Sequence, residues 1–268
     1  MKVTHRRIMI ALDPAAPRPD ALLALKAFAD GSLELTGVFI ENADLQRLAS
    51  LPVAREVRLT TSQSDRLDEH SLRQQFDACA RAVEQALREA QRTLQTRVRF
   101  QVLRGNVLKE LQRAAAEMDW LIIGRSLRSA GARTWLGATP ERIASVIAEG
   151  PAPVNLLFVH EPWATGGHVL WLDDGSAAAA RARDQAMLIA AADRLPLQAA
   201  TLAAEPATAT THDDAMDAVT IDSLRALRRQ CEHDEPRVIV LPDTEAIRQS
   251  IDFEALLADL PASVAIVR

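Results

Sequence analysis

Short, continuous apolar runs alternate along this chain with segments whose apolar residues recur every three or four positions. Ile8–Leu12 is such a run and stops at Asp13, and Leu33–Ile40 and Trp120–Ile123 are built in the same way. Continuous apolar runs suit strands buried on both faces of a parallel sheet, and the longer spacing suits helices packed on that sheet. The alternation therefore predicts an α/β fold with a doubly wound parallel sheet.

The part of the chain up to residue 160 is expected to form five strands and four helices. Its clearest helix spans 71–95, where the apolar residues from Leu72 to Leu94 form a single stripe. The segment 41–70 mixes Pro, Ser and charges without a steady period, so we expect a loop with a short helix there. The expected strands are 8–12, 33–40, 98–102, 120–123 and 154–159.

The same pattern begins again after residue 167. Val169–Leu172 ends in Asp173–Ser176, much as the first expected strand ends at Asp13, and an Ala-rich helix follows in each case. Residues 160–167 combine Pro with paired Gly and show no periodicity, which indicates a domain boundary. We expect two domains, 1–160 and 168–268, the second a smaller, truncated copy that has lost one strand and one helix.

Several of the second copy's elements can be placed from the pattern. Strands are expected at 197–202, 238–241 and 264–267, and helices at 221–231 and 253–260. No glycine occurs from Pro242 to the last residue of the sequence. We therefore expect no phosphate-binding loop in this copy, and we interpret it as a structural partner of the first.

Composition narrows the classes of function. A net charge of -5 and a pI near 5.7 supply no overall attraction for nucleic acid or anionic lipid. The two cysteines are far apart in sequence and imply no disulfide framework. No apolar stretch approaches the roughly 20 residues that span a bilayer. We expect a cytoplasmic protein with neither a nucleic-acid nor a membrane partner.

Motifs for catalysis are missing from the sequence. It contains no Gly-x-Ser-x-Gly elbow, no Walker loop and no dinucleotide fingerprint. Cys231–His233 and His212–Asp214 come nearest to a metal-ligand spacing, and both lie in acidic segments. We predict that the chain is not an enzyme and has no metal centre of its own.

The segment 124–139, after the fourth expected strand, is the best candidate for a ligand site. It combines glycines, hydroxyl side chains and three arginines, and then opens a helix at Pro140. Backbone N–H groups at the start of a helix can bind an anion. In a doubly wound sheet this loop should meet Asp13 and Ile40 at the carboxyl edge. By themselves, Asp13 equally fits a helix cap and Ile40 equally fits the sheet core.

These segments resemble the universal stress protein family. In that family the first strand ends in an Asp, as at Asp13, and the fourth ends in a Gly-x2-Gly-x9-Gly-(Ser/Thr) loop. Gly124 and Gly137 match the outer glycines of this loop, and Leu103–Val107 resembles the family's glycine turn before the third helix. The likeness covers residues 6–160. A tandem member of the family is therefore expected, with a degenerate nucleotide loop in the first domain and none in the second.

The resemblance implies an adenine nucleotide alpha hydrolase-like fold and a non-catalytic regulator of the stress response. Its ligand would be ATP or another adenine nucleotide, with magnesium present only as an ion bound to that nucleotide. The two domains would pair within the chain, and the protein would form a homodimer. The implied nucleotide-binding residues are Asp13, Ile40, Gly105, Gly124, Arg125, Ser126, Gly137, Ala138 and Thr139.

Two residues depart from the family's loop. Leu127 stands at the second glycine, where a Cβ hinders close approach to phosphates, and Ala138 replaces the Ser or Thr. Three hypotheses therefore stay open. In the first, the chain is a nucleotide-binding regulator that hydrolyses its ligand weakly or not at all. In the second, it is an interaction scaffold that has lost the ligand. In the third, it is a regulatory subunit of a transporter or another partner.

Overall fold

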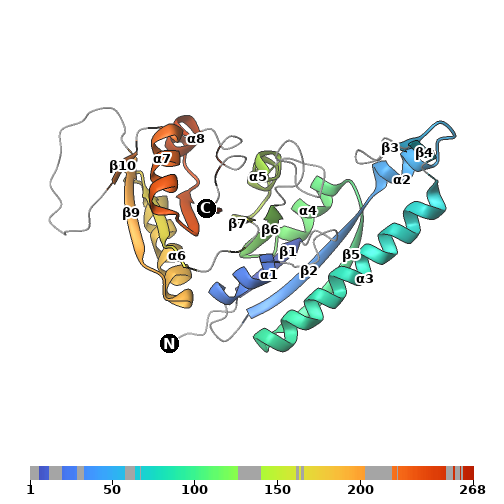
Figure 1. The fold of residues 1–268 in the computed structure, drawn as a ribbon, viewed down its shortest axis with the longest axis horizontal. Helices are drawn as coiled ribbons and strands as arrows, with labels where there is room; N and C mark the ends of the chain where they lie inside the picture. The colour runs from blue at the N-terminus through green and yellow to red at the C-terminus, as the bar shows by residue number, and fades with distance from the viewer. Residues whose placement is uncertain are drawn as a thin grey trace.

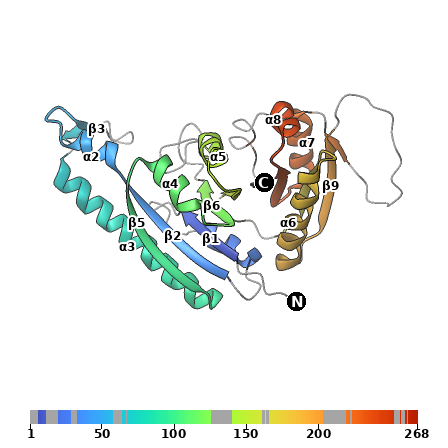
Figure 2. The same ribbon diagram turned by 180° about the vertical axis from the view of Figure 1, so that it is seen from behind.

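The computed structural model describes most of the chain and forms a single ten-stranded sheet with helices on both faces (Figures 1 and 2). A separate two-stranded sheet lies at one tip of the molecule. The described residues are 6–11, 20–28, 33–57, 64–66, 68–125, 140–160, 163, 166–202, 219–221, 223–251, 256, 260 and 262–268.

The N-terminal half of the sheet contains five parallel strands in the order β5-β2-β1-β6-β7. The chain runs outward from β1 to β2 and β5 and then returns to β6 and β7 on the other side. Strand order therefore reverses between β1 and β6, and the predicted doubly wound parallel sheet is confirmed. The strands are β1 (Arg6–Ala11), β2 (Leu33–Asn42), β5 (Arg97–Gly105), β6 (Trp120–Arg125) and β7 (Asn155–His160).

Helices bury both faces of the central strands of this half, which is why β1, β6 and β7 contain continuous apolar runs, whereas the edge strand β5 does not. Ile8 and Ile10 of β1 belong to one core cluster, whereas Met9 and Ala11 belong to the other. The helices are α1 (Asp20–Ala24), the 3-10 helix η1 (Leu25–Phe28), α3 (Glu69–Leu94), α4 (Val107–Ala115) and α5 (Pro140–Ala148). The predicted long helix is α3. It packs so closely on β2 that a Cβ at Gly37 would collide with Leu87 Cδ1.

The segment between β2 and α3 contains more structure than its sequence predicts. The expected short helix is α2 (Ala43–Ala49), and Asn42 caps it by accepting a hydrogen bond from the N–H of Asp44 at 2.9 Å. An unexpected antiparallel hairpin follows, formed by β3 (Arg55–Val57) and β4 (Ser64–Arg66). Together they lie beyond the end of β2, at one tip of the molecule (Figure 1).

The C-terminal half repeats the strand order of the first, as β10-β9-β8-β11-β12. Its strands are β8 (Val169–Asp173), β9 (Leu197–Leu202), β10 (Val219–Ile221), β11 (Val238–Pro242) and β12 (Ser263–Val267). The prediction that this copy had lost a strand is wrong, because β10 pairs in parallel with β9 over three residue pairs. Residues 203–218, where the helix expected to be missing would fall, lie outside the described residues.

The described helices of this half include α6 (Ala177–Asp193), α7 (Leu224–Asp234) and α8 (Glu245–Ser250). Helix α7 begins three residues later than the sequence predicts, after the cap residue Ser223. Helix α8 was not expected. Most of the helix predicted over 253–260 lies outside the described residues, although Leu256 is helical.

The two halves meet through their last strands, β7 and β12. These strands are antiparallel, with Phe158 opposite Val264 and Leu156 opposite Ile266. One buried core cluster contains all four of these residues and extends into both halves. The sheet is consequently continuous from the edge strand β5 at one end of the molecule to the edge strand β10 at the other (Figures 1 and 2).

Candidate functional site

The carboxyl ends of β2, β1 and β6 form the edge where a doubly wound sheet binds its ligand. Ala11, the last described residue of β1, pairs with Val38 of β2 and Ile123 of β6. Strand β2 continues to Asn42, so residues 39–42 extend past the described end of β1 while staying paired with β5. Alternate residues of a parallel strand direct their backbone N–H and C=O groups to opposite sides. Part of this β2 extension therefore directs its backbone donors and acceptors toward the β1 side.

Ile40 and Gly124 lie on opposite sides of the end of β1. Ile40 belongs to the β2 extension, and its side chain is buried in the core. Gly124 is buried, directly follows Ile123 and pairs with Val159 of β7. Arg125 ends β6, and its side chain is not described. The remaining predicted residues of this edge, Asp13, Ser126, Gly137, Ala138 and Thr139, lie outside the described residues.

Gly105 is placed beside Asn42, two strands away from β1. Its φ is +154°, and a Cβ here would stand 3.0 Å from Cγ of Glu110. The next residue, Asn106, caps α4 by accepting a hydrogen bond from the N–H of Lys109 at 3.2 Å. The conformation of the turn from β5 into α4 therefore explains a glycine at position 105, whether or not a ligand is bound.

Sequence reasoning misses Glu41, which stands next to Ile40 in the β2 extension. Its side chain is only 7% exposed, yet it carries a carboxylate. Oε2 forms an ion pair with Arg104 Nε at 2.7 Å and accepts a hydrogen bond from Gln46 Nε2 at 3.3 Å. The signal in the sequence is an acid placed directly after an apolar strand run, at the end that faces the ligand edge.

At the matching edge of the C-terminal half, the turn that follows β8 is described. After β8, Asp173 Oδ1 accepts a hydrogen bond from the N–H of Gly175 at 2.9 Å, and Gly175 takes a φ of +73°. Ser176 then caps α6 by accepting from the N–H of Ala179 at 3.1 Å. The Asp-Gly-Ser turn is therefore satisfied by its own backbone and by the helix that follows.

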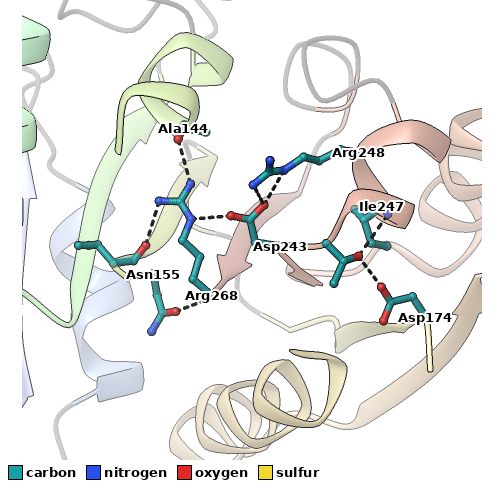
Figure 3. A network of polar contacts seen from close by, with 9 residues as sticks. Ala144, Asn155, Asp174, Asp243, Ile247, Arg248 and Arg268 are labelled. Carbon is teal, nitrogen blue, oxygen red and sulfur yellow. Dashed lines mark hydrogen bonds and ion pairs between the residues drawn. The ribbon is translucent and has the colours of Figure 1, made fainter. Parts of the chain in front are cut away.

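A side-chain hydrogen bond crosses the point where strand order reverses in this half (Figure 3). Asp174 follows β8 and Thr244 follows β11, and these strands are neighbours. Thr244 Oγ1 donates to Asp174 Oδ2 and accepts from the N–H of Ile247, which also caps α8. Burial raises the pKa of Asp174, but hydrogen bonds from Ser176 and Thr244 together hold that pKa below its ordinary value.

Beside this bridge lies a buried ion pair of the C-terminal half, and its Arg268 also contacts the N-terminal half (Figure 3). Asp243 accepts from Arg248 Nη2 at 2.7 Å and from Arg268 Nε at 2.6 Å. The side chains of Asp243 and Arg268 are 8% and 9% exposed. Arg268 also donates from Nη2 to the carbonyl of Ala144 in α5 at 2.9 Å, and from its backbone N–H to Asn155 Oδ1 at 3.0 Å. The C-terminal edge is thus tied to the helix that follows the predicted loop.

Of the two sequences with metal-like spacing, the structure describes only Cys231–His233. Burial raises the pKa of the Cys231 thiol to about 12, whereas the side chain of His233 is exposed. His212–Asp214 lies outside the described residues. In the described ranges, no three His, Cys, Asp or Glu side chains group as metal ligands would. The described helices also include none with the length and apolar character needed to cross a membrane.

Solved structures share this architecture, although no family model and no curated protein matches the sequence. A universal stress protein from Archaeoglobus fulgidus DSM 4304 superposes with a TM-score of 0.65 at 12% identity, over 97% of this chain and 96% of that one. The chain has the universal stress protein fold. Because nearly all of both chains is covered, the universal stress protein fold here includes both halves of the sheet.

Two structures from Pseudomonas aeruginosa agree with this assignment of fold. One, from UCBPP-PA14, is provisionally named a universal stress protein and gives a TM-score of 0.59 at 15% identity, covering 98% of this chain and 93% of its own. The other, a functionally unknown protein from PAO1, gives 0.58 at 14% identity and covers 98% and 92%. Identities this low show that the universal stress protein fold is shared and say nothing more.

Proposed function

We propose that this chain is a universal stress protein-like regulator that binds ATP or another adenine nucleotide at the carboxyl edge of its N-terminal half. The observation that carries the proposal is the contrast between the two edges. In the N-terminal half, the β2 extension and Gly124 flank the end of β1. In the C-terminal half, Asp174 and Thr244 bond to each other across the equivalent position.

The proposed pose follows from the chemistry of this edge. Backbone groups of the β2 extension at Ile40 contact the base, since a planar heterocycle with donors and acceptors suits a strand edge. The phosphates lie toward Gly124 and the start of α5, where backbone N–H groups favour anions. Arg125, Ser126, Gly137, Ala138 and Thr139 complete this part of the site in the proposal, and Asp13 completes the base contact. Magnesium enters only with the nucleotide.

The proposed regulator is non-catalytic and cytoplasmic, and its second half has a structural role. Residues 1–160 form the nucleotide-binding domain and 168–268 its partner. Support for the partner role comes from β12, which pairs with β7, and from Arg268, which bonds to Ala144 in α5. We extend the proposal to a homodimer of the tandem chain.

A scaffold that has kept the fold and lost the ligand is the second candidate. It is favoured by Leu127 and Ala138, which replace a small glycine and a hydroxyl in the loop. The two candidates differ in a single measurable property, because the scaffold has no saturable affinity for an adenine nucleotide.

Titration calorimetry of the full chain with ATP and magnesium tests the proposal. We expect saturable binding of one nucleotide per chain, lost in Gly124→Val because the added side chain fills the approach to the loop. Thr244→Val is the matched control in the C-terminal half and should bind as the wild type does. Absence of saturation at millimolar ATP in the wild type would refute nucleotide binding and leave the scaffold.

A further inference from the structure

Glu41 has the features of a ligand-binding carboxylate that is held in place before the ligand arrives. It lies in the β2 extension, three residues beyond Val38, the last residue of β2 paired with β1. Its charge is balanced by Arg104, whose own side chain is 74% exposed. Its orientation is also restrained by Gln46 at 3.3 Å. Both contacts are made by one oxygen, Oε2.

The second oxygen, Oε1, accepts no hydrogen bond from the described residues. The partners of Oε2 come from β5 and from α2, and β5 flanks β2 on the side away from β1. Among the described residues, the fully buried side-chain atoms without a partner are His168 Nε2 and Trp171 Nε1. Oε1 of Glu41 is not one of them, so this oxygen keeps contact with solvent. Glu41 therefore offers one free acceptor at the ligand edge.

A carboxylate at the carboxyl end of the second strand suits one part of a nucleotide in particular. It accepts hydrogen bonds and donates none, so phosphates are repelled and hydroxyl groups are preferred. In doubly wound sheets that bind dinucleotides, an acid near this position accepts from ribose hydroxyls. The base is already assigned to the neighbouring backbone of Ile40 in the proposed pose. The ribose is then the part of the ligand adjacent to Glu41.

We infer that Glu41 Oε1 accepts a hydrogen bond from a ribose hydroxyl, and that Glu41 thereby selects nucleotides with an intact ribose. This inference rests on the proposed nucleotide site. Arg104 and Gln46 are positioning residues in it, because they fix the carboxylate without contacting the ligand. A purely structural role for Glu41 would affect all nucleotides alike.

The test compares the affinities of the full chain for ATP and for 2′,3′-dideoxy-ATP, which lacks both hydroxyls. We expect the wild type to bind ATP at least about tenfold more tightly, as for a hydrogen bond to a charged group. In Glu41→Gln the ratio should approach one, because ATP loses affinity and dideoxy-ATP does not. Glu34→Gln is the matched control. Glu34 is on the same strand and pairs with Arg99 of β5 at 2.8 Å, but lies at the opposite end.

The outcomes separate this inference from the proposed function. If wild-type chain binds neither nucleotide, the proposed site fails and this inference fails with it. If it binds both equally, the site stands and the role of Glu41 is refuted, whatever the stability of the variant. An unchanged ratio in Glu41→Gln, or an equal loss of the ratio in Glu34→Gln, also refutes it.

Discussion

The carboxyl edges of the two halves have the same strand order and opposite uses of their side chains. In the N-terminal half, the β2 extension and Gly124 flank the end of β1, and Glu41 Oε1 accepts no hydrogen bond from the described residues. In the C-terminal half, Asp174 is bonded to Thr244, and Asp243 is bonded to Arg248 and Arg268 (Figure 3). The polar groups of the second edge are thus consumed within the protein.

The difference lies mainly in the residues that follow the fourth strand of each half. Near its end β6 has Gly124, which carries no side chain, whereas β11 ends in Pro242, which has no N–H to donate. Two polar residues follow Pro242. Asp243 bonds to Arg248 and Arg268, and Thr244 bonds to Asp174. A repeated fold therefore need not repeat its side-chain contacts, and the residues after β11 help to join the two halves through Arg268.

Breaking the buried ion pair of this joint should have the largest effect. Asp243→Ala leaves Arg268 charged and 9% exposed without its main partner. We expect the free energy of unfolding to fall by about 3–5 kcal/mol, as is typical when one member of a buried pair is removed. Urea unfolding followed by circular dichroism measures this change.

An exposed ion pair provides the control for that experiment. Asp44 and Arg47 are 60% and 82% exposed, so Asp44→Ala should cost less than about 1 kcal/mol. A similarly small loss in Asp243→Ala would mean that Arg268 turns out to solvent at little cost. The joint would then not depend on this contact.

Removing the hydroxyl of Thr244 should have an intermediate effect. Thr244→Val keeps the shape of the side chain but loses the cap of α8 and the bond to Asp174, for about 1–2 kcal/mol. Thr244→Ser restores the hydroxyl and should recover most of the loss in the same urea assay. The opened edge should still bind no second nucleotide, because no glycine follows Leu241. A second equivalent of bound ATP in Thr244→Val would contradict our explanation of the difference.

A substitution at Gly105 tests whether this glycine of the N-terminal half has a structural role or a role in binding the ligand. Gly105→Ala should lower the free energy of unfolding by about 1 kcal/mol, because its φ of +154° and the contact with Glu110 both disfavour a Cβ. Affinity for ATP, measured by calorimetry, should stay within about twofold of the wild type if the role of Gly105 is local. A complete loss of binding would assign Gly105 to the ligand site instead.

The sequence predicts the strands of this fold well where burial on both faces leaves a continuous apolar run. Ile8 to Ala11 is such a run, since successive residues enter opposite core clusters. Strand β10 is missed because Val219–Ile221 is too short to create a pattern and lies in an Ala- and Thr-rich stretch. Its strand conformation is stabilised by pairing with β9. Pairing between distant segments cannot be read from local periodicity.

The residues of the candidate site likewise fall into those that local sequence patterns predict and those that depend on contacts between distant segments. Gly124 and Ile40 are found from local patterns, and the structure places them around the end of β1. The bridge from Asp174 to Thr244 connects residues 70 positions apart, and neither residue alone is unusual before a helix. The role of Glu41 likewise depends on Arg104, a partner from another strand. Such contacts become visible only when the strand order is known.

The smallest expected effect is a pH dependence of the free energy of unfolding that comes from Asp174 at the C-terminal edge. The pKa of Asp174 lies below its ordinary value of 3.8, because the hydrogen bonds from Ser176 and Thr244 outweigh burial. The unfolded chain therefore binds more protons near this pH, and stability rises with pH there. The contribution of Asp174 is complete above about pH 4 and is lost as the pH falls through the folded pKa. At this partly exposed site it should amount to less than about 1 kcal/mol.

Urea unfolding of the wild type and Thr244→Val at several pH values isolates this contribution. The two proteins should differ most near neutral pH, and the difference should narrow below about pH 4, because protonation removes the bond that the variant already lacks. A difference that stays constant down to about pH 3 would show that the carboxylate of Asp174 gains nothing from Thr244. In that case the second edge would be closed by the helix cap alone, and its contrast with the first edge would rest on Asp243 and Arg268.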